Sequence, residues 1–357
     1  MDSIRQQRLR NQYLSKPSKK NPVDLLKSLV AIQAQDYAGA KWGLGQRATG
    51  ADDKQIEQAI SDGRILRLHV MRPTWHFVSA EDVRWLLLLT APRVNAATSS
   101  HFRKAGLDDQ ILRRTNKAIS KALSGGQQLT RAELHDAVAR VGIEPGDSTR
   151  FGHILLRAEL DALICSGARR GKQFTYALLA ERAPQSRILE RDEALSELAL
   201  RYFSTRGPAT VLDFVWWSGL KVAEAKRGID INGKLLEKCS IDDKLFWFSP
   251  KKARANQPLA SRVHLLPLYD EYFIGYKDRS AALHPKANQL KSDTSFVFDP
   301  PMVVDGRSVG VWERVLDKTS VKIKLHPFVR LTRIDKADFR GAAAKYAEFL
   351  GKDLELS

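Results

Sequence analysis

The sequence predicts an α+β protein in which units of helices and a β-hairpin follow one another, with a β-rich segment at the carboxyl end. Helix-start signals recur ahead of apolar residues at helical spacing, and short β-like runs follow them in pairs. After about Arg262 the helical spacing gives way to short apolar runs. A chain of 357 residues with 43% hydrophobic content can bury the cores of two to four domains.

The charge balance favours a polyanionic partner. Lys and Arg total 58 against 41 Asp and Glu, which gives a formal net charge of +17. A surplus of this size attracts nucleic acid or an anionic membrane surface. The longest apolar run lies near Trp85 to Leu89 and ends at Ala91-Pro92, much shorter than the roughly 20 residues of a membrane-spanning helix. We therefore expect nucleic acid as the partner and no membrane.

The amino-terminal residues and the cysteines exclude further classes. Residues 1–5 carry charges but no apolar core or small-residue cleavage site follows them, so we expect no secretory signal and a cytoplasmic, nucleoid-associated protein. Cys165 and Cys239 lie far apart and outside any zinc or iron–sulfur pattern. The sequence therefore predicts two reduced core thiols, no metal and no cofactor.

The first unit carries clear helix and strand signals. Ser3 with Gln6 has the spacing of a capping box for a first helix. Asn21 as the cap and Pro22 at the first helical position begin a second helix, whose period continues to Gln33. A third helix is expected from Asp53 to a stop at Gly63, followed by strands Ile65 to Met71 and Trp75 to Val78 around Arg72-Pro73-Thr74. Helices followed by a tight β-hairpin indicate a winged helix.

The same order returns twice. In the second copy Thr130 and Glu133 form a capping box, a helix runs through residues 154–163, and the tip of the next hairpin reads Arg169-Arg170-Gly171-Lys172. Such a basic tip is suited to lie along a phosphate backbone. In the third copy we expect helices at 195–203 and 210–217 and strands at 234–241 and 245–248. Tandem units imply an extended binding surface.

The carboxyl-terminal segment is predicted to be a small β-rich domain. Its strands are expected at Val263 to Leu268, Ser295 to Phe298, Val303-Val304, Val309 to Trp312 and Val321 to Leu325. Asp305-Gly306 is a type I′ hairpin signal, a helix from Lys336 to Leu350 closes the segment, and Ser249 to Gln257 is the expected flexible stretch. The predicted division is 1–105, 106–183 and 184–258 for the three winged helices and 259–357 for the β-rich domain.

Several standard catalytic motifs are missing from the sequence. There is no phosphate-binding loop of the G-x-x-x-x-G-K-[ST] type, and Gly43-Leu44-Gly45 is not completed to a dinucleotide fingerprint. Neither a G-x-S-x-G elbow nor an H-E-x-x-H pair occurs. The protein therefore either only binds DNA or catalyses a reaction that needs few functional groups.

Short segments spread over nearly the whole chain carry a family resemblance. These are Ala31-Ile32-Gln33-Ala34-Gln35, Met71-Arg72-Pro73-Thr74-Trp75-His76-Phe77, Leu265-Leu266-Pro267, Asp270-Glu271-Tyr272 and Gly275-Tyr276-Lys277-Asp278-Arg279. Together they resemble the winged-helix DNA glycosylases of the AlkZ/YcaQ family. The resemblance implies three tandem winged helices and a β-rich domain around a concave DNA-binding face. It also implies a monomer that binds alkylated or crosslinked double-stranded DNA.

The resemblance further implies excision of N7-alkylated purines, including unhooking of interstrand crosslinks, by a Q-x-Q or Q-x-D motif. The motif falls on Gln33 and Gln35. A related subgroup has Asp at the second position, whereas here the carboxylate comes one residue later, at Asp36. This favours the Gln-Gln subtype and leaves the preference between crosslinks and single adducts open.

Glutamine suits this chemistry. An N7-alkylated purine is cationic, so it leaves as a neutral base and needs no strong general base. An amide oxygen can hold the attacking water and stabilise the cationic transition state. On a helix Gln33 and Gln35 would diverge by roughly 200°, so we expect the helix to end near Ala34, as Asp36 and Gly39 suggest. A crosslinked base is tethered to both strands, so the site should be an open cleft without a deep flipping pocket.

Seven residues are candidate DNA contacts: Lys41, Arg47, Arg72, His76, Arg169, Arg170 and Lys172. If Trp75 and Phe77 face the core, His76 faces outward by strand alternation, but a hydrogen-bonded structural histidine is the equal alternative. Arg72 could contact phosphates or cap its turn. The hairpin-tip residues are assigned to phosphates and not to bases.

Two alternatives complete the sequence-based interpretation. Asp270, Glu271, Lys277 and Arg279 could be catalytic, but an internal ion-pair network that holds the last domain to the third winged helix is preferred. We expect the function of a monofunctional DNA glycosylase, with Gln33 and Gln35 as the catalytic residues. The alternative is a non-enzymatic winged-helix regulator, although regulators usually pair one winged helix with a dimerisation or ligand domain.

Overall fold

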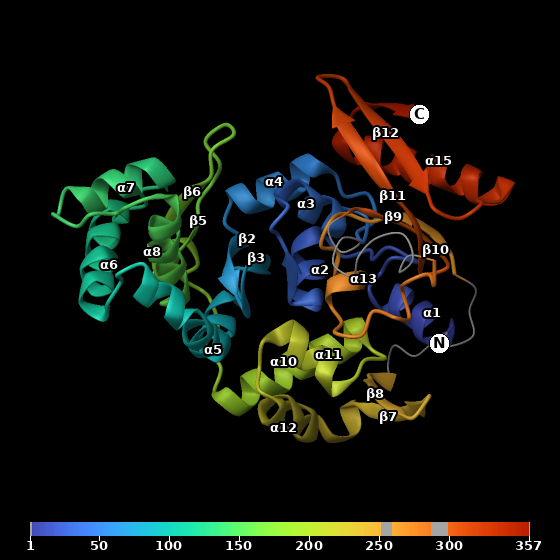
Figure 1. The fold of residues 1–357 in the computed structure, drawn as a ribbon, viewed down its shortest axis with the longest axis horizontal. Coiled ribbons are helices and arrows are strands. Elements are labelled where there is room, and N and C mark those ends of the chain that lie inside the picture. The colour runs from blue at the N-terminus through green and yellow to red at the C-terminus, as the bar shows by residue number, and fades with distance from the viewer. Residues whose placement is uncertain (1, 251–258, 287–298, 357) are drawn as a thin grey trace. The chain divides into compact units, whose positions relative to one another are not determined.

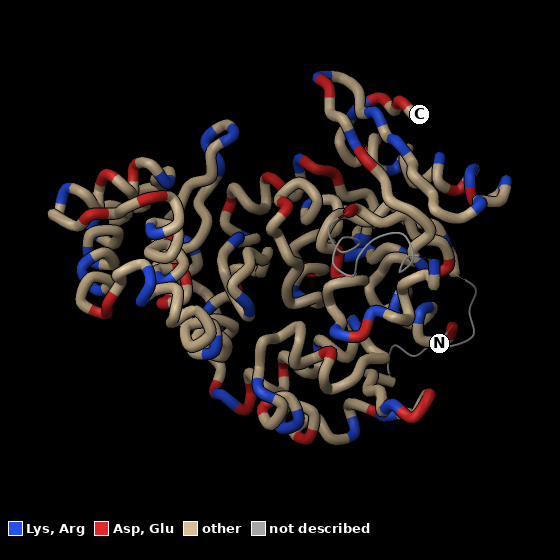
Figure 2. Tube along the Cα trace, viewed as in Figure 1, with Lys and Arg blue, Asp and Glu red and all other residues tan. Residues whose placement is uncertain are grey.

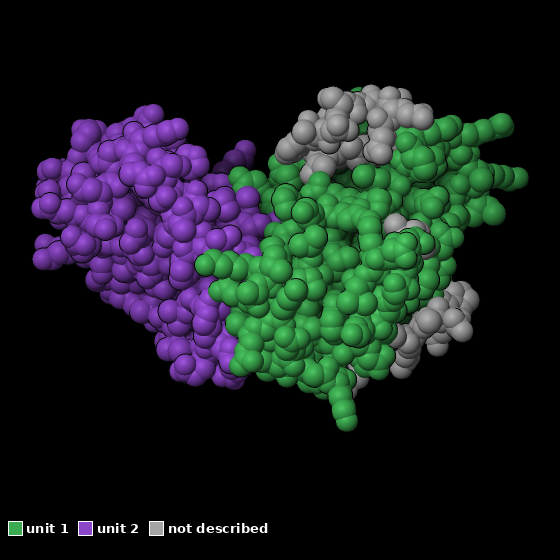
Figure 3. Space-filling view, turned by 60° about the horizontal axis from the view of Figure 1, so that its bottom comes forward, with its two compact units in different colours: residues 1–57, 195–217, 221–357 green, residues 58–194, 218–220 purple. Residues whose placement is uncertain are grey.

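The computed structural model describes residues 2–250, 259–286 and 299–356 and confirms the mixed α+β class. The chain divides into two compact units, drawn in different colours in Figure 3. Unit 1 comprises residues 1–57, 195–217 and 221–357, and unit 2 comprises residues 58–194 and 218–220. Unit 1 is therefore assembled from three separate stretches of sequence, whereas unit 2 is almost continuous.

Figure 1 shows the elements of unit 2 in blue to green. They are β2 (Ile65–Val70), β3 (Arg72–Ser79), α5 (Val83–Lys104), α6 (Asp109–Leu123), β4 (Leu129–Thr130), α7 (Arg131–Ala139), α8 (Ser148–Leu160), β5 (Ile164–Ser166), β6 (Thr175–Leu178) and α9 (Leu179–Arg182). A core cluster of buried apolar residues, among them Leu123, Leu134, Val138 and Ile154, holds α6, α7 and α8 together.

Unit 1 contains the two ends of the chain. Its first elements are α1 (Asp2–Asn11), α2 (Pro22–Leu29), β1 (Ala31–Gln33) and α3 (Tyr37–Gly45). Three helices cross the unit boundaries in sequence: α4 (Asp53–Ser61), α10 (Arg191–Arg206) and, by its last residue, α11 (Val211–Ser218). The remaining elements are α12 (Val222–Asn232), the 3₁₀ helix η1 (Gly233–Leu235), β7 (Glu237–Ile241), β8 (Lys244–Phe248), β9 (Val263–Leu265), α13 (Glu271–Ile274), β10 (Pro301–Val304), β11 (Arg307–Leu316), β12 (Ser320–Pro327), α15 (Arg333–Leu350) and β13 (Asp353–Leu356).

One order of elements recurs three times: helix, strand, two helices, two strands. In unit 2 this is α6, β4, α7, α8, β5 and β6, and the strands form a sheet in the order β4-β6-β5. The series α2, β1, α3, α4, β2, β3 precedes it. The series α10, α11, α12, β7, β8 follows it, with an isolated antiparallel bridge from Ala209 to Trp247 of β8 as the early strand. The order of helices and hairpin that was predicted for the third copy is thus present.

The capping signals are confirmed in two of three positions. Thr130 and Glu133 form the reciprocal capping box of α7, and Asn21 caps α2 with Pro22 at its start. The box predicted at Ser3 is wrong, because α1 begins at Asp2 and the Ser3 hydroxyl instead accepts from Gln7. Because α1 begins at Asp2, Ser3 lies inside its first turn and does not cap it.

The carboxyl-terminal part of unit 1 is a five-stranded sheet in the order β13-β12-β11-β10-β9. β12 and β13 are parallel, and the other neighbours are antiparallel. Asp305 (φ +48°) and Gly306 (φ +79°) form the two-residue turn between β10 and β11, which confirms the type I′ prediction. The predicted strand 295–298 and residues 251–257 of the predicted flexible stretch lie outside the described residues.

Two boundary predictions are wrong. The second helix does not continue to Gln33: α2 ends at Leu29, Val30 takes a φ of +68°, and the strand β1 follows. The first hairpin turns at Met71 (φ +64°), so the segment expected as its turn is the start of β3. In the first case tertiary contacts of the backbone carbonyls, described below, override the helical period.

Pro92, which closes the longest apolar run of the sequence, does not end a helix. It lies inside α5, where it removes the hydrogen bond to the carbonyl of Leu88. Leu88 is on the exposed face of the helix, so water can satisfy that carbonyl. Among the described helices, α5 included, none has the length and hydropathy needed to span a bilayer.

Candidate active site

Gln33 and Gln35 lie at the end of a short strand and not on a helix. Gln33 is the last residue of β1 and is 8% exposed, while Gln35 is exposed in the bend before α3. The divergence of roughly 200° that a helix would impose on two such residues therefore does not arise. The backbone N–H of Gln33 donates to Oε1 of Glu271, at 3.0 Å.

A buried ion pair fixes the backbone of this strand. Arg206 at the end of α10 donates to Oε2 of Glu271 through Nε (3.1 Å) and Nη2 (2.7 Å), and both side chains are at most 1% exposed. The same guanidinium donates to the carbonyls of Leu29 (2.9 Å) and Ala31 (3.0 Å). Because these bonds take up carbonyls on either side of Val30, they explain why α2 ends there.

Trp217 of α11 completes this arrangement, which we call the β1 clamp: Arg206, Glu271 and Trp217. Its indole Nε1 donates to Oε2 of Glu271 at 2.8 Å. Glu271 thus accepts from a guanidinium, an indole and the Gln33 backbone, which are strong, charge-assisted bonds in a water-free setting. The clamp leaves little freedom for the Gln33 main chain.

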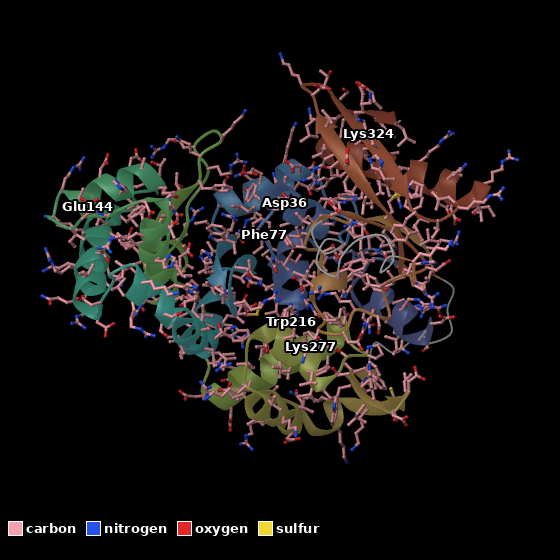
Figure 4. All side chains as sticks on the ribbon, in the orientation of Figure 1. Asp36, Phe77, Glu144, Trp216, Lys277 and Lys324 are labelled. Atoms are coloured by element: carbon pink, nitrogen blue, oxygen red, sulfur yellow. The ribbon has the colours of Figure 1, made fainter. Side chains whose placement is uncertain are left out.

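Asp36, the carboxylate next to the motif, has a structural task. It caps α3 by accepting from the N–H of Gly39 (3.0 Å), and its Oδ2 lies 3.2 Å from Nη2 of Arg314 on β11. Figure 4 labels Asp36 at the start of α3. A Cβ on Gly39 would lie 2.3 Å from Oδ2 of Asp36, so a larger residue there would displace this carboxylate. Since the carboxylate is engaged in this way, it does not replace the second glutamine of the motif.

Arg47, predicted to contact DNA, is buried instead. Its guanidinium binds both carboxylate oxygens of Asp270, at 2.6 and 2.8 Å, and each side chain is 1% exposed. It also donates to the carbonyl of Gly43 and to Oε1 of Gln12. Arg47 thus joins the end of α3 to the segment before α13.

Lys41 is likewise an internal residue. It is 5% exposed, and its Nζ lies 2.9 Å from Asp53 and 2.7 Å from Glu57 on α4. Two carboxylates neutralise this ammonium group, so it is not available to a phosphate. The sequence showed the charge of Lys41 but not its burial.

The outward orientation predicted for His76 is wrong. The last four residues of β3 are all buried, so strand alternation does not separate an inner from an outer face. His76 is fully buried, with Nδ1 2.8 Å from the carbonyl of Thr74 and Nε2 3.4 Å from Nη2 of Arg72. This matches the hydrogen-bonded structural alternative. Arg72 itself is half-buried.

The basic tip of the β5–β6 hairpin is present and appears blue in Figure 2. Lys172 is exposed, and Arg169 is half-buried over the ring of Phe174 at 5.4 Å. Arg170 pairs with Glu133 at 2.8 Å. The N–H of Thr130, followed by Arg170, lowers the pKa of Glu133 to about 2. Of the three predicted contacts, Lys172 is therefore the most accessible to a phosphate.

The predicted network between the last segment and the third copy is confirmed for its main member, because Glu271 binds Arg206 and Trp217 of α10 and α11. Lys277 contributes its backbone, whose N–H donates to Asp213 of α11 at 2.9 Å. Arg279 donates to the carbonyl of Phe273. Figure 4 labels Lys277 and the α11 residue Trp216. No sequence motif had singled out Arg206 or Trp217.

The buried histidine His264 on β9 should make the stability of the protein depend on pH. Burial, with a smaller contribution from Arg47, lowers its pKa to about 3. The unfolded chain takes up this proton below about pH 6.5 and the folded chain does not, so stability should fall as the pH drops from 6.5 to 3. In urea unfolding at several pH values, wild type should lose up to about 1.4 kcal/mol per pH unit more than His264→Gln. Parallel curves would contradict this.

The cysteines match the prediction only in part. Both are free thiols, and Cys165 is buried, but Cys239 is only partly buried. Burial raises the pKa of Cys165 to about 12, which keeps it an unreactive thiol at neutral pH.

The family model described as DNA glycosylase AlkZ-like matches residues 26–349. The chain belongs to this family. Among curated proteins it is similar to an interstrand DNA cross-link repair glycosylase of Streptomyces sahachiroi, with 24% identity over 322 residues and 86% of each chain covered. The solved structure of Streptomyces sahachiroi DNA glycosylase AlkZ matches 100% of this chain and 99% of its own, with a TM-score of 0.83 and 21% identity. This AlkZ-like chain thus shares the fold of that enzyme.

Proposed function

We propose that this AlkZ-like protein is a monofunctional DNA glycosylase that hydrolyses the N-glycosidic bond of N7-alkylated purines and unhooks interstrand crosslinks. The observation that carries the proposal is the β1 clamp, in which a buried ion pair and an indole fix the backbone of Gln33. A buried ion pair that binds the backbone of a three-residue strand at the motif is typical of a site that needs a fixed geometry. Family membership supports the same activity.

In this proposal the three repeated series are winged helices, divided as 1–105, 106–183 and 184–258, and 259–357 is the β-rich domain. The topology β4-β6-β5 behind α6, α7 and α8 supports this for the second copy. The protein would act as a monomer on double-stranded DNA through a concave face. The net charge of +17 favours that partner.

Gln33 and Gln35 would hold the attacking water by their amide oxygens. The alkylated purine already carries a positive charge, so it departs as a neutral base and the developing charge lies on the sugar. An amide dipole stabilises that charge without a proton transfer. The fixed backbone of Gln33 and the exposure of Gln35 fit a first residue that positions and a second that faces solvent.

The test is base release under single-turnover conditions from duplex DNA containing N7-methylguanine or an N7-linked crosslink. We expect release by wild type and at least roughly tenfold slower release by Gln33→Ala or Gln35→Ala, about 1.4 kcal/mol of transition-state stabilisation. Gln55→Ala, a change of another exposed glutamine, is the matched control and should release base at the wild-type rate. No excision, together with tight binding of one DNA sequence, would favour a non-enzymatic regulator.

DNA affinity should fall steeply with salt, because each neutralised phosphate releases counterions. We expect Lys172→Ala to reduce the slope of log affinity against log salt by about one, since this exposed lysine lies at the tip of the β5–β6 hairpin. Fluorescence anisotropy at a series of salt concentrations measures the slope. An unchanged slope would remove Lys172 from the DNA contacts.

A further inference from the structure

Unit 2 contains a cavity that lies apart from the glutamine motif. A cavity of about 730 Å³ lies between the β2–β3 hairpin, α7, the start of α8 and the β5–β6 hairpin. Aromatic side chains and cations share its wall: Arg67, Trp75, Arg131, Phe151, Lys172 and Phe174. The volume is within the range of about 300–1,000 Å³ that is usual for small-molecule sites.

On one wall of the cavity a single cation lies over two aromatic rings. The guanidinium of Arg67 lies 4.5 Å from the ring centre of Trp75 and 4.6 Å from that of Phe174. Trp75 also contacts the ring of His69, with 4.4 Å between centroids. Cation–π contacts of this kind hold flat surfaces in place. Phe174 remains 38% exposed, so part of its ring is open to a ligand.

The facing wall is also fixed. Arg131, the first residue of α7, lies 5.2 Å from the ring centre of Phe151 and donates to the carbonyl of Ser148. Burial raises the pKa of Tyr176 to about 12, so this lining residue is a neutral phenol at physiological pH. The carboxylate of Asp147 is engaged as the cap of α8. The cavity thus offers flat apolar faces with Arg131 and the exposed Lys172 beside them.

We propose that this cavity receives one unpaired nucleotide of DNA. Its base would pack against the exposed part of the Phe174 ring, which Arg67 holds in place, and its phosphate would lie against Lys172 and Arg131. Base stacking on aromatic side chains combined with a cationic path for the backbone is the general chemistry of unpaired-strand recognition. A purely apolar ligand would not account for the cations, and a bare phosphate would not account for the rings. The assignment rests on the proposed function in that both take DNA as the substrate.

The test compares two duplexes that differ only in one bulged position, which holds either an adenine nucleotide or an abasic residue. Affinities of the full-length protein are measured by fluorescence anisotropy. We expect wild type to bind the adenine bulge about tenfold more tightly than the abasic bulge. The preference should shrink to less than about twofold in Phe174→Leu, which keeps apolar bulk but loses the ring, and persist in Phe174→Tyr. Phe174 is partly exposed, so these variants should fold.

Equal affinity of wild type for both bulges, or a preference unaffected by Phe174→Leu, would overturn the assignment. Micromolar binding of free deoxyadenosine monophosphate without discrimination between the bulges would overturn it in favour of a free-nucleotide site. Base release from N7-methylguanine DNA by the same preparations separates the two proposals. Release without bulge preference leaves the glycosylase proposal intact, whereas bulge preference without release leaves only the nucleotide site.

Discussion

Replacing Glu271 by alanine should lower the free energy of unfolding by about 3–5 kcal/mol. The change leaves the guanidinium of Arg206 buried without a counter-charge and removes the acceptor of Trp217 and of the Gln33 backbone. Removing one member of a buried pair costs more than the pair contributes, because the remaining charge stays desolvated. Urea unfolding followed by far-UV circular dichroism measures the loss.

A matched pair of variants shows whether the charge is the cause. The double substitution Arg206→Met with Glu271→Leu removes both charges and should be less destabilised than Glu271→Ala alone. Asp62→Asn breaks an exposed pair with Arg64 and should hardly shift the transition. If the double variant is the less stable of the two, the uncompensated charge is not what destabilises Glu271→Ala.

Arg47→Ala should produce a similar loss of about 3–5 kcal/mol. It leaves the carboxylate of Asp270 buried and opens the end of α3, where Arg47 also holds Gly43 and Gln12. The Tyr272 N–H still donates to Asp270, which satisfies part of the carboxylate. Chemical denaturation is again the measurement.

The Arg47→Ala variant also distinguishes a structural role of Arg47 from a contact with DNA. The slope of log affinity against log salt should be unchanged in Arg47→Ala under conditions where it is folded, because a buried guanidinium releases no counterions from DNA. This contrasts with the smaller slope expected of Lys172→Ala. A reduced slope in folded Arg47→Ala would restore the original assignment of this residue to phosphates.

The sequence predicts local features of this fold well where the residues that determine them are close neighbours in the chain. Asn21-Pro22, the Thr130–Glu133 box and Asp305-Gly306 each fix a few backbone angles, and all three are present. The end of α2 could not be predicted, because Arg206 lies some 175 residues away and determines it by binding the carbonyls of Leu29 and Ala31.

In the candidate site, too, contacts between residues far apart in the chain could not be predicted. The glutamine motif and the role of Glu271 as an internal partner could be inferred from sequence. Burial of Lys41 and Arg47 could not, because a basic residue on a short helix looks the same whether its partner is a phosphate or a distant carboxylate such as Asp270. The full burial of β3 around His76 similarly depends on packing that a period of two does not reveal.

The discontinuity of unit 1 bears on when the protein becomes competent during synthesis. Residues 58–194 leave the ribosome before residues 206 and 271, so the strand that carries Gln33 gains the contacts of Arg206 and Glu271 only after a delay. At translation rates of about 5–20 residues per second, that delay is on the order of ten seconds or more. Until residue 271 has been made, the backbone N–H of Gln33 lacks its Glu271 acceptor, and a truncated product that stops before residue 271 should lack the β1 clamp.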